Sequence, residues 1–170
     1  MGIVAAYLKE NDLFNNLTDH QLELIEPICQ ELIVQPGEYI FHESTHETEL
    51  YLIIHGQVDI LIDPNLVSDS TMPVSAPIII DRFWSGQSFG EMALVDEGIR
   101  SGSAVAREKD THILRIARRD LLDLCEQHPE LGYRIMYNLA LDISQKIRNI
   151  GLKMRAAILL NHQKPPPGPL

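Results

Sequence analysis

The sequence has few of the features that mark secreted, membrane-spanning or disulfide-stabilised proteins. Its only cysteines, Cys29 and Cys125, are far apart and form no Cys-x-x-Cys pair. This spacing does not suit a zinc knuckle or a redox dithiol, and it favours a reducing compartment. No run approaches the roughly 18 apolar residues of a membrane span, and the first residues lack the basic start and apolar core of a secretory signal. We therefore expect a cytoplasmic protein with no membrane partner.

Positive charge is also scarce. The chain has 14 lysines and arginines against 24 aspartates and glutamates, which gives a net charge of −10 at pH 7. Proteins bind nucleic acids largely by neutralising phosphates with lysine and arginine, so this balance predicts no nucleic-acid partner. It does not exclude a small anionic ligand, because such a ligand needs only one or two local cations.

Catalytic motifs are missing as well. The sequence has no Gly-x-Ser-x-Gly elbow, no Walker phosphate loop and no His-Glu-x-x-His motif. We therefore expect a protein that is not an enzyme, with no catalytic residues, no metal site and no cofactor.

The first part of the chain, residues 3–33, has the periodicity of helices. Apolar residues recur there at helical spacing, and Thr18 with Gln21 forms the pattern of a capping box. Pro27 marks a kink or an end, and Pro36-Gly37 is a strong break.

Short strands follow between about residues 37 and 117. Apolar and polar residues alternate in several runs, and glycine or proline separates most of them, as in an all-β sandwich or roll. The expected strands are 38–41, 50–54, 57–62, 78–83, 103–107 and 111–116. The polar stretch 63–77 reads as a mobile surface loop.

Two helices are expected within residues 118–160. The first covers 119–125, and the second begins near Pro129, a residue that suits a first helical turn. The second helix carries an apolar stripe made of Leu131, Ile135, Leu139, Ile143, Ile147, Ile150, Met154 and Ile158. At about 1.5 Å per residue the stripe is roughly 40 Å long, longer than one small roll. We therefore predict that its start packs on the roll and that its far end meets a second copy, giving a homodimer.

One segment combines the groups that an anion-binding site needs. Gly90 has no Cβ and lets the backbone approach a ligand, and residues 91–94 fit one helical turn whose free N–H groups favour an anion. Arg100 adds a guanidinium at the start of the next strand, with two serines close behind it. Glu91 is unsuited to a phosphate but suits a sugar hydroxyl, from which a carboxylate accepts a hydrogen bond.

This segment resembles the phosphate-binding cassette of the cyclic-nucleotide-binding domains, which occur in catabolite-activator-type regulators, kinase regulatory subunits and gated channels. The family pattern is Phe-Gly-Glu-(Leu/Met)-Ala-Leu, a short spacer, and then Arg-(Ser/Ala)-Ala-(Thr/Ser)-Val. The matching residues are Phe89, Gly90, Glu91, Met92, Ala93, Leu94, Arg100, Ser101 and Ser103. Residues 37–43 and 50–58 look like the family's first two strand motifs, so the resemblance covers about residues 10–155.

The resemblance implies a mainly β fold, a double-stranded β-helix or jelly roll with N-terminal helices and a C-terminal helix pair. A single domain would cover residues 1–160, with the roll at about 37–117, the helices at about 118–160 and a disordered proline-rich tail at 161–170. Its ligand would be a cyclic nucleotide, cAMP or cGMP. The ligand-binding residues would be Phe89, Gly90, Glu91, Met92, Ala93, Arg100, Ser101 and Ser103.

In such a site Arg100 would bind the cyclic phosphate and Glu91 would accept from the ribose 2′-hydroxyl. Backbone N–H groups at Gly90, Met92 and Ala93 would complete the cradle together with the Ser101 hydroxyl. No residue of the long helix can be assigned to the base, so the choice between cAMP and cGMP stays open.

The implied function is a non-catalytic sensor in which the ligand changes the helix surface that a separate effector protein meets. Catabolite-activator-type regulators carry a helix-turn-helix after the long helix, whereas only a short proline-ending tail follows here. The sequence therefore predicts no DNA-binding domain of its own.

Two other functions remain open. Cupins share the roll and bind metals through His-x-His strands, and His42 and His46 lie among the expected strands here but four residues apart. A cupin-like metalloenzyme is therefore one alternative. The other is a structural adaptor whose pocket is degenerate and empty. A separate reading of the two charged residues is that Glu91 and Arg100 form a plain surface ion pair.

Overall fold

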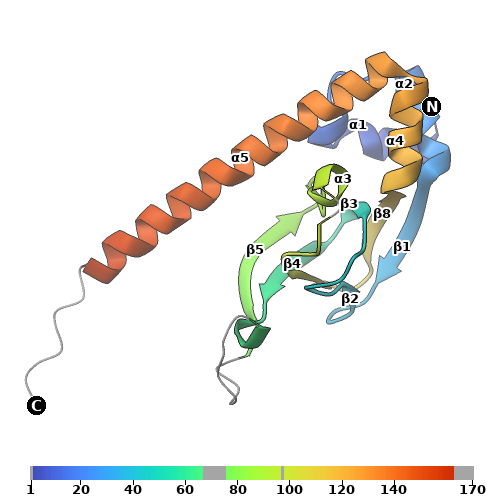
Figure 1. Ribbon diagram of the computed structural model, residues 1–170. Helices are drawn as coiled ribbons and strands as arrows, with labels where there is room; N and C mark the ends of the chain where they lie inside the picture. The colour runs from blue at the N-terminus through green and yellow to red at the C-terminus, as the bar shows by residue number, and fades with distance from the viewer. Residues whose placement is uncertain (1, 67–75, 97, 163–170) are drawn as a thin grey trace, which may run out of the picture.

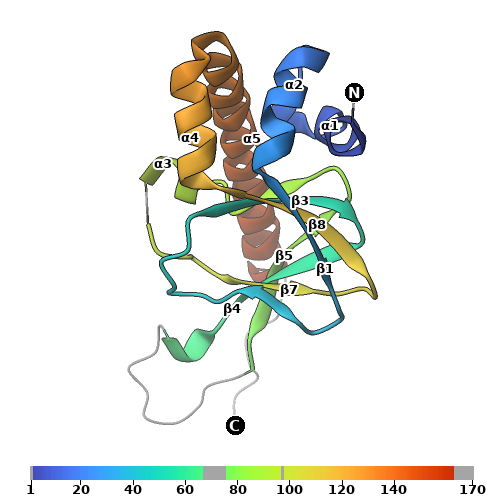
Figure 2. The same cartoon turned by 90° about the vertical axis from the view of Figure 1, so that its right-hand side faces the viewer.

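The computed structural model describes residues 2–66, 76–96 and 98–162, which form a β-roll with helices gathered at one end (Figure 1). Figure 2, turned by 90°, shows the same gathering of α1, α2, α4 and the start of α5 above the strands. Residues 67–75 of the expected surface loop and 163–170 of the expected tail lie outside the described residues. Residues 161 and 162, also expected in the tail, instead continue the last helix.

Two four-stranded antiparallel sheets form the roll, with strand orders β1-β8-β3-β6 and β2-β7-β4-β5. The strands are β1 Cys29–Val34, β2 Tyr39–Phe41, β3 Glu49–His55, β4 Gln57–Ile62, β5 Ile78–Trp84, β6 Ser88–Phe89, β7 Ser103–Ala106 and β8 Thr111–Ala117. All six strands expected from the sequence are present, each within one residue at either end. The mainly β class with flanking helices is confirmed.

The prediction of helix throughout residues 3–33 is wrong at its end, because Cys29–Val34 is strand β1. This strand pairs with β8 along its whole length, from Cys29 opposite Ile116 to Val34 opposite Thr111. Pro27 lies in a short 3-10 helix, Glu26–Ile28, and the apolar and β-branched residues that follow find backbone partners in β8. The pairing with β8 therefore decides that residues 29–34 form a strand instead of a helix.

The N-terminal helical segments are short: α1 Ile3–Lys9, the 3-10 helix η1 Asp12–Phe14, α2 Asp19–Ile25 and the 3-10 helix η2 Glu26–Ile28. The predicted capping box at the start of α2 is confirmed. The Thr18 hydroxyl accepts from the N–H of Gln21 at 3.2 Å, and the Gln21 side chain accepts from the N–H of Thr18 at 2.9 Å.

Two clusters of buried apolar side chains hold the molecule together. One joins the N-terminal helices to β3, β8 and the C-terminal helices. The other fills the roll and contains Phe41, Tyr51, Ile53, Val58, Phe89, Ala104 and Ile113. Phe89 stacks on Tyr51 with ring centroids 5.2 Å apart, so it fixes the start of the segment that the sequence marks as a cassette.

The C-terminal helices are α4 Arg118–Gln127 and α5 Pro129–His162, and α5 projects beyond the roll (Figure 1). The apolar stripe of α5 divides into two halves. Leu131, Ile135 and Leu139 are buried in the core, whereas Ile147, Ile150, Met154 and Ile158 are 50–63% exposed. Within the described ranges, no helix has the length and hydropathy that a bilayer crossing demands.

A buried asparagine fixes the first half of α5 against the N-terminal segment. The Asn138 side chain donates to the carbonyl oxygens of Leu13 at 3.0 Å and Asn15 at 2.8 Å. Both carbonyls belong to η1 or to the residues just after it, so these hydrogen bonds fix α5 against the N-terminal segment. Asn138 lies about two turns before Lys146, where α5 contacts Phe83 of the second sheet.

Candidate functional site

A cavity of about 500 Å³ lies between the second sheet, the cassette and α5. Its volume falls within the range of roughly 300–1,000 Å³ that is usual for small-molecule sites. Its wall is mainly apolar, with Phe41 and Phe83 from the strands and Ile143, Ile147 and Ile150 from α5. The charged side chains that line it are Asp81, Glu91, Asp96, Arg100 and Lys146. A few charged groups in an apolar wall are typical of a binding site for a small polar ligand.

Seven of the eight predicted ligand-binding residues line this cavity: Phe89, Gly90, Glu91, Met92, Ala93, Arg100 and Ser101. Ser103 is not among the lining residues. It lies on β7, and its hydroxyl accepts from the N–H of Glu43 at 2.8 Å, which ties the turn after β2 to the strand. Ser103 therefore has a contact that the cassette pattern does not indicate.

Gly90 permits a close approach that no other residue would allow. Its φ is +77°, in the left-handed region, and a Cβ there would stand 2.7 Å from Nη1 of Arg100 and 3.0 Å from the carbonyl oxygen of Glu49. Glycine is thus required both by the backbone conformation and by the space beside the guanidinium.

Arg100 is buried beside the cavity and held from two sides. Its Nη2 donates to the carbonyl oxygen of Glu49 at 2.7 Å, its Nη1 donates to that of Gly90 at 3.1 Å, and its guanidinium lies 4.1 Å from the centre of the Phe41 ring. Burial lowers the pKa of Arg100 from its ordinary value, and the neighbouring Tyr51 and acidic side chains oppose that shift. The group keeps its charge, because an arginine pKa starts far above neutrality.

Two of the three nitrogens of this guanidinium donate to described residues, and the third does not. Nε of Arg100 is buried and has no hydrogen-bond partner among the described residues, and Oε2 of Glu49, which lies 3.9 Å from Nη2, is likewise buried without one. A buried charged donor without a partner is costly, so the site favours an incoming acceptor.

Glu91 is also buried, and its partner comes from α5. Nζ of Lys146 lies 3.1 Å from Oε2 of Glu91 and 2.8 Å from Oδ2 of Asp142, and it donates to the carbonyl oxygen of Ser88 at 3.0 Å. The same ammonium lies 5.0 Å from the centre of the Phe83 ring. The carboxylate and the guanidinium thus face one cavity but are neutralised by different partners, so they do not form the surface ion pair considered from the sequence.

The sequence assigned no residue of the long helix to the ligand, so the contact of Lys146 was missed. A signal was present in the helix periodicity. Ile135, Leu139, Asp142 and Lys146 are spaced 4, 3 and 4, so the two charged residues continue the face that Ile135 and Leu139 bury. Asp142 and Lys146 thus lie on a helix face that is otherwise buried, which indicates that the surface packed against this face carries a hydrogen-bond acceptor for the lysine.

The helical turn expected at residues 91–94 is present but begins two residues later, as α3 Ala93–Asp96. Ala93 and Leu94 are buried and anchor the turn, whereas Met92, Val95 and Ile99 are more than half exposed. These exposed apolar side chains line the same cavity as Ile147 and Ile150 of α5. The cavity therefore opens between two apolar rims, one on the cassette and one on the helix.

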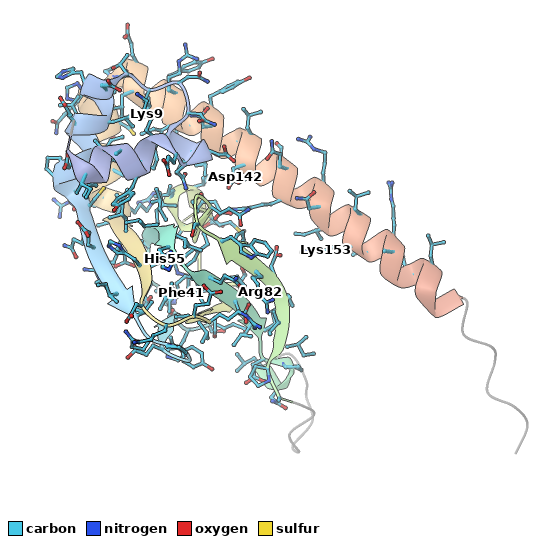
Figure 3. All side chains as sticks on the ribbon, turned by 180° about the vertical axis from the view of Figure 1, so that it is seen from behind. Lys9, Phe41, His55, Arg82, Asp142 and Lys153 are labelled. Atoms are coloured by element: carbon cyan, nitrogen blue, oxygen red, sulfur yellow. The ribbon has the colours of Figure 1, made fainter. Side chains whose placement is uncertain are left out.

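A second tie joins α5 to the sheet further along the helix. Nζ of Lys153 lies 2.7 Å from Oδ1 of Asp81 on β5, with both side chains exposed. Figure 3 shows Asp142 close to the body of the molecule and Lys153 further along the same helix. A cavity of about 440 Å³ on the other flank of α5 shares Asp81, Phe83 and Lys146 with the first.

The cupin-like alternative requires a cluster of metal ligands. No three histidine, cysteine, aspartate or glutamate side chains within the described residues are arranged to hold a metal ion. His42 instead stacks on the Tyr39 ring, with centroids 4.3 Å apart.

The comparisons with known proteins agree on one family. Residues 31–128, more than half of the chain, match the family profile of the cyclic nucleotide-binding domain. The cyclic AMP receptor protein of Thermus thermophilus is 31% identical over 86% of this chain and 62% of its own length. Human cGMP-dependent protein kinase 2 is 28% identical over 66% of this chain and 14% of its own. The chain thus spans less than two thirds of the length of either relative.

Solved structures show the same fold. The Thermus thermophilus catabolite activator protein matches with a TM-score of 0.68 at 29% identity, over 86% of this chain and 63% of that one. The regulatory domain of Toxoplasma gondii PKA, crystallised with cAMP, matches with a TM-score of 0.63 at 17% identity, over 86% and 49%. The jelly-roll fold is therefore confirmed by relatives that share little sequence with the chain.

Proposed function

Since the chain belongs to the cyclic nucleotide-binding domain family, we propose that the cavity beside α5 binds a cyclic nucleotide and that this domain is a non-catalytic sensor. The observation that carries the proposal is the state of Arg100. Its guanidinium is buried at the cavity, and Nε has no partner among the described residues. An exocyclic phosphate oxygen would supply the missing acceptor, and a charge-assisted hydrogen bond of this kind contributes about 1.5–3 kcal/mol.

The cassette supplies the rest of the phosphate cradle in this proposal. The N–H groups of Gly90, Met92 and Ala93 and the hydroxyl of Ser101 belong to residues that line the cavity beside Arg100. Phe89 supports this cradle, because its buried ring anchors the cassette to the interior of the roll. Ser103 acts indirectly, by holding Glu43 against β7.

Glu91 would bind the sugar. It is a buried acceptor on the same wall as Arg100, and its partner Lys146 occupies one of its two carboxylate oxygens, Oε2. The other oxygen and the remaining lone pairs suit the ribose 2′-hydroxyl, because an ionised carboxylate can accept about four hydrogen bonds.

The base would meet mainly apolar surface. From α5 the cavity receives Ile143, Ile147 and Ile150, and Lys146 is the one polar side chain of α5 that lines it within the described residues. The name of one relative refers to cyclic AMP and that of another to cGMP, so neither purine is favoured by kinship.

A homodimer through α5 is part of the proposal. The far half of its stripe, Ile147, Ile150, Met154 and Ile158, is exposed on one helix face. The same face of a second copy is self-complementary and would cover these side chains in a two-fold helix pair. Because this exposed half of the stripe begins where the helix borders the cavity, a ligand could shift the population of α5 positions that a partner meets.

Titration calorimetry with cAMP and cGMP tests the proposed function directly. The wild-type protein should bind at least one of them, and Arg100→Ala should weaken that binding about 10- to 100-fold. Arg119→Ala is the matched control, because Arg119 is exposed on α4 and its ion pair within the described part of the chain is with Asp123 one turn on. No detectable binding to any cyclic nucleotide by the folded wild-type protein would contradict the proposal and favour an adaptor with an empty pocket.

A further inference from the structure

We infer that Lys146 is a positioning residue for the ligand: its ion pair holds the buried Glu91 so that the carboxylate is aimed at a ribose 2′-hydroxyl, and the site therefore selects ribonucleotides over 2′-deoxyribonucleotides. The inference rests on the proposed function, because it concerns the ligand of the same cavity. It names a selective residue on α5, outside the cassette and outside residues 31–128 that match the family profile.

The contacts of Lys146 join three parts of the molecule. Its ammonium lies between Glu91 of the cassette and Asp142 one turn earlier on α5, at 3.1 Å and 2.8 Å, and it donates to the backbone of β6 at Ser88. Its side chain is 23% exposed and that of Glu91 only 9%. An ion pair this sheltered is weakly screened by salt, unlike an exposed pair.

A hydroxyl cannot take the place of this cation. A buried carboxylate that loses its cationic partner either stays charged at a large cost or takes up a proton. The ribose hydroxyl is neutral, so it offers a hydrogen bond but no compensating charge. The ligand therefore binds beside the Glu91–Lys146 pair and leaves it intact.

The negative charge of the ligand also supports a role for Lys146 in the site. The cavity is lined by two cations, Arg100 and Lys146, and by three acids, Asp81, Glu91 and Asp96. A cyclic phosphate is an anion. Without Lys146 it would enter a wall with three carboxylates and a single cation, so the lysine lowers the repulsion that Glu91 would otherwise exert.

Selection for the ribose follows from the strength of the hydrogen bond. A bond to an ionised acceptor contributes more than one between neutral groups, about 10- to 100-fold in affinity against roughly 2- to 10-fold. A 2′-deoxyribonucleotide lacks the 2′-hydroxyl donor and therefore forms neither kind of hydrogen bond. The ratio of the two dissociation constants therefore reports the orientation of Glu91 toward the 2′-hydroxyl, whereas a general loss of packing lowers both affinities alike.

The experiment measures dissociation constants of a cyclic nucleotide and its 2′-deoxy analogue by titration calorimetry, using cAMP with 2′-deoxy-cAMP and the corresponding guanine pair. Wild type should prefer the ribonucleotide about 10- to 100-fold, and Lys146→Met should lower this preference below about 10-fold. Lys146→Arg, which keeps a cation, should restore most of it. In a Glu91→Gln background, Lys146→Met should change the preference no further.

Lys153→Met is the matched control on the same helix. Lys153 also pairs with an aspartate, Asp81, but through exposed side chains, 57% and 39%, and away from Glu91. It should keep the wild-type preference. If Lys146→Met does not fold, Lys146→Gln carries the same comparison.

The outcomes separate the inference from the proposed function. If wild type binds no cyclic nucleotide, the proposed function fails. If wild type binds and Lys146→Met keeps its preference for the ribonucleotide, or loses affinity for both ligands equally, the role of Lys146 is refuted and the proposed function stands.

Discussion

Gly90 and Arg100 are fitted to each other across the cassette. The Gly90 carbonyl accepts from Nη1 of Arg100 at 3.1 Å, and a Cβ on Gly90 would stand 2.7 Å from that same nitrogen. The glycine is therefore part of the guanidinium's binding site, in addition to supplying a turn with φ of +77°.

The first prediction compares two glycines with nearly equal φ. Gly37 has φ of +84°, and nothing lies within 4 Å of the place that a Cβ would occupy there, so Gly37→Ala should cost only backbone strain, about 1–2 kcal/mol. Gly90→Ala should cost more, because it also displaces Arg100. We expect Gly90→Ala to weaken cyclic-nucleotide binding by about 10-fold or more, on the scale of one charge-assisted hydrogen bond, and Gly37→Ala to leave it unchanged. Urea unfolding and titration calorimetry measure the two effects, and equal affinities would show that Arg100 tolerates the methyl group.

The second prediction concerns the anchor of α5. Asn138 donates to the carbonyls of Leu13 and Asn15, and its removal leaves two sheltered acceptors without that donor. Asn138→Ala should lower the free energy of unfolding by about 1–3 kcal/mol. Asn149→Ala, on an exposed position of the same helix, should change it by no more than about 0.5 kcal/mol. Urea denaturation curves followed by circular dichroism provide the comparison. A similar small effect for both would mean that packing alone places α5.

Six of the eight strands were predictable from the sequence, because several of them alternate apolar and polar residues and glycine or proline separates most of them. Strand β6, with only Ser88 and Phe89, is too short to show such a pattern. Strand β1 was missed because it directly follows a helical segment and because its pairing partner, β8, lies about 80 residues away in the chain. Local periodicity carries no information about a partner at that distance.

The cassette residues were predictable for a similar reason, since their order in the chain is the motif itself. The contact between Glu91 and Lys146 was not, because it joins two elements 55 residues apart and depends on where α5 crosses the roll. The contact of Ser103 with Glu43 spans 60 residues and was missed in the same way. Resemblance to a motif identifies residue types, whereas the partner of each charge comes only from the packed structure.

The third prediction is a loss of stability in alkaline solution. Burial raises the pKa of Cys29 from 9.0 to about 12, and burial together with the nearby Glu49 raises the pKa of Tyr51 from 10.0 to about 12. Each pKa is higher in the folded than in the unfolded chain. Both groups therefore stabilise the fold fully below pH 9, and that contribution is lost as the pH rises from about 9 to 12.

Urea midpoints measured between pH 8 and pH 11.5 test this. The midpoint should fall above pH 9 to 10, and Tyr51→Phe should make the fall shallower, because the phenol no longer ionises on unfolding. Tyr133→Phe serves as the matched control, since it removes a phenol that is 65% exposed in the folded chain instead of a buried one. A midpoint that stays level to pH 11.5, or an equal slope in Tyr51→Phe, would contradict the assignment.

The last prediction tests the dimer through the exposed half of the α5 stripe. Ile150 is 56% exposed on the stripe, and Leu152 is 61% exposed two residues later, on nearly the opposite side of the helix. Wild type should form a dimer in sedimentation-velocity experiments. Ile150→Glu should shift it to monomer, because a carboxylate in the seam faces the same charge from the second copy across the two-fold axis. Leu152→Glu adds the same charge to the same helix outside the seam, and it should leave the dimer intact. A wild-type monomer at all accessible concentrations would refute this interface, and dissociation by both variants would place the contact on another face of α5.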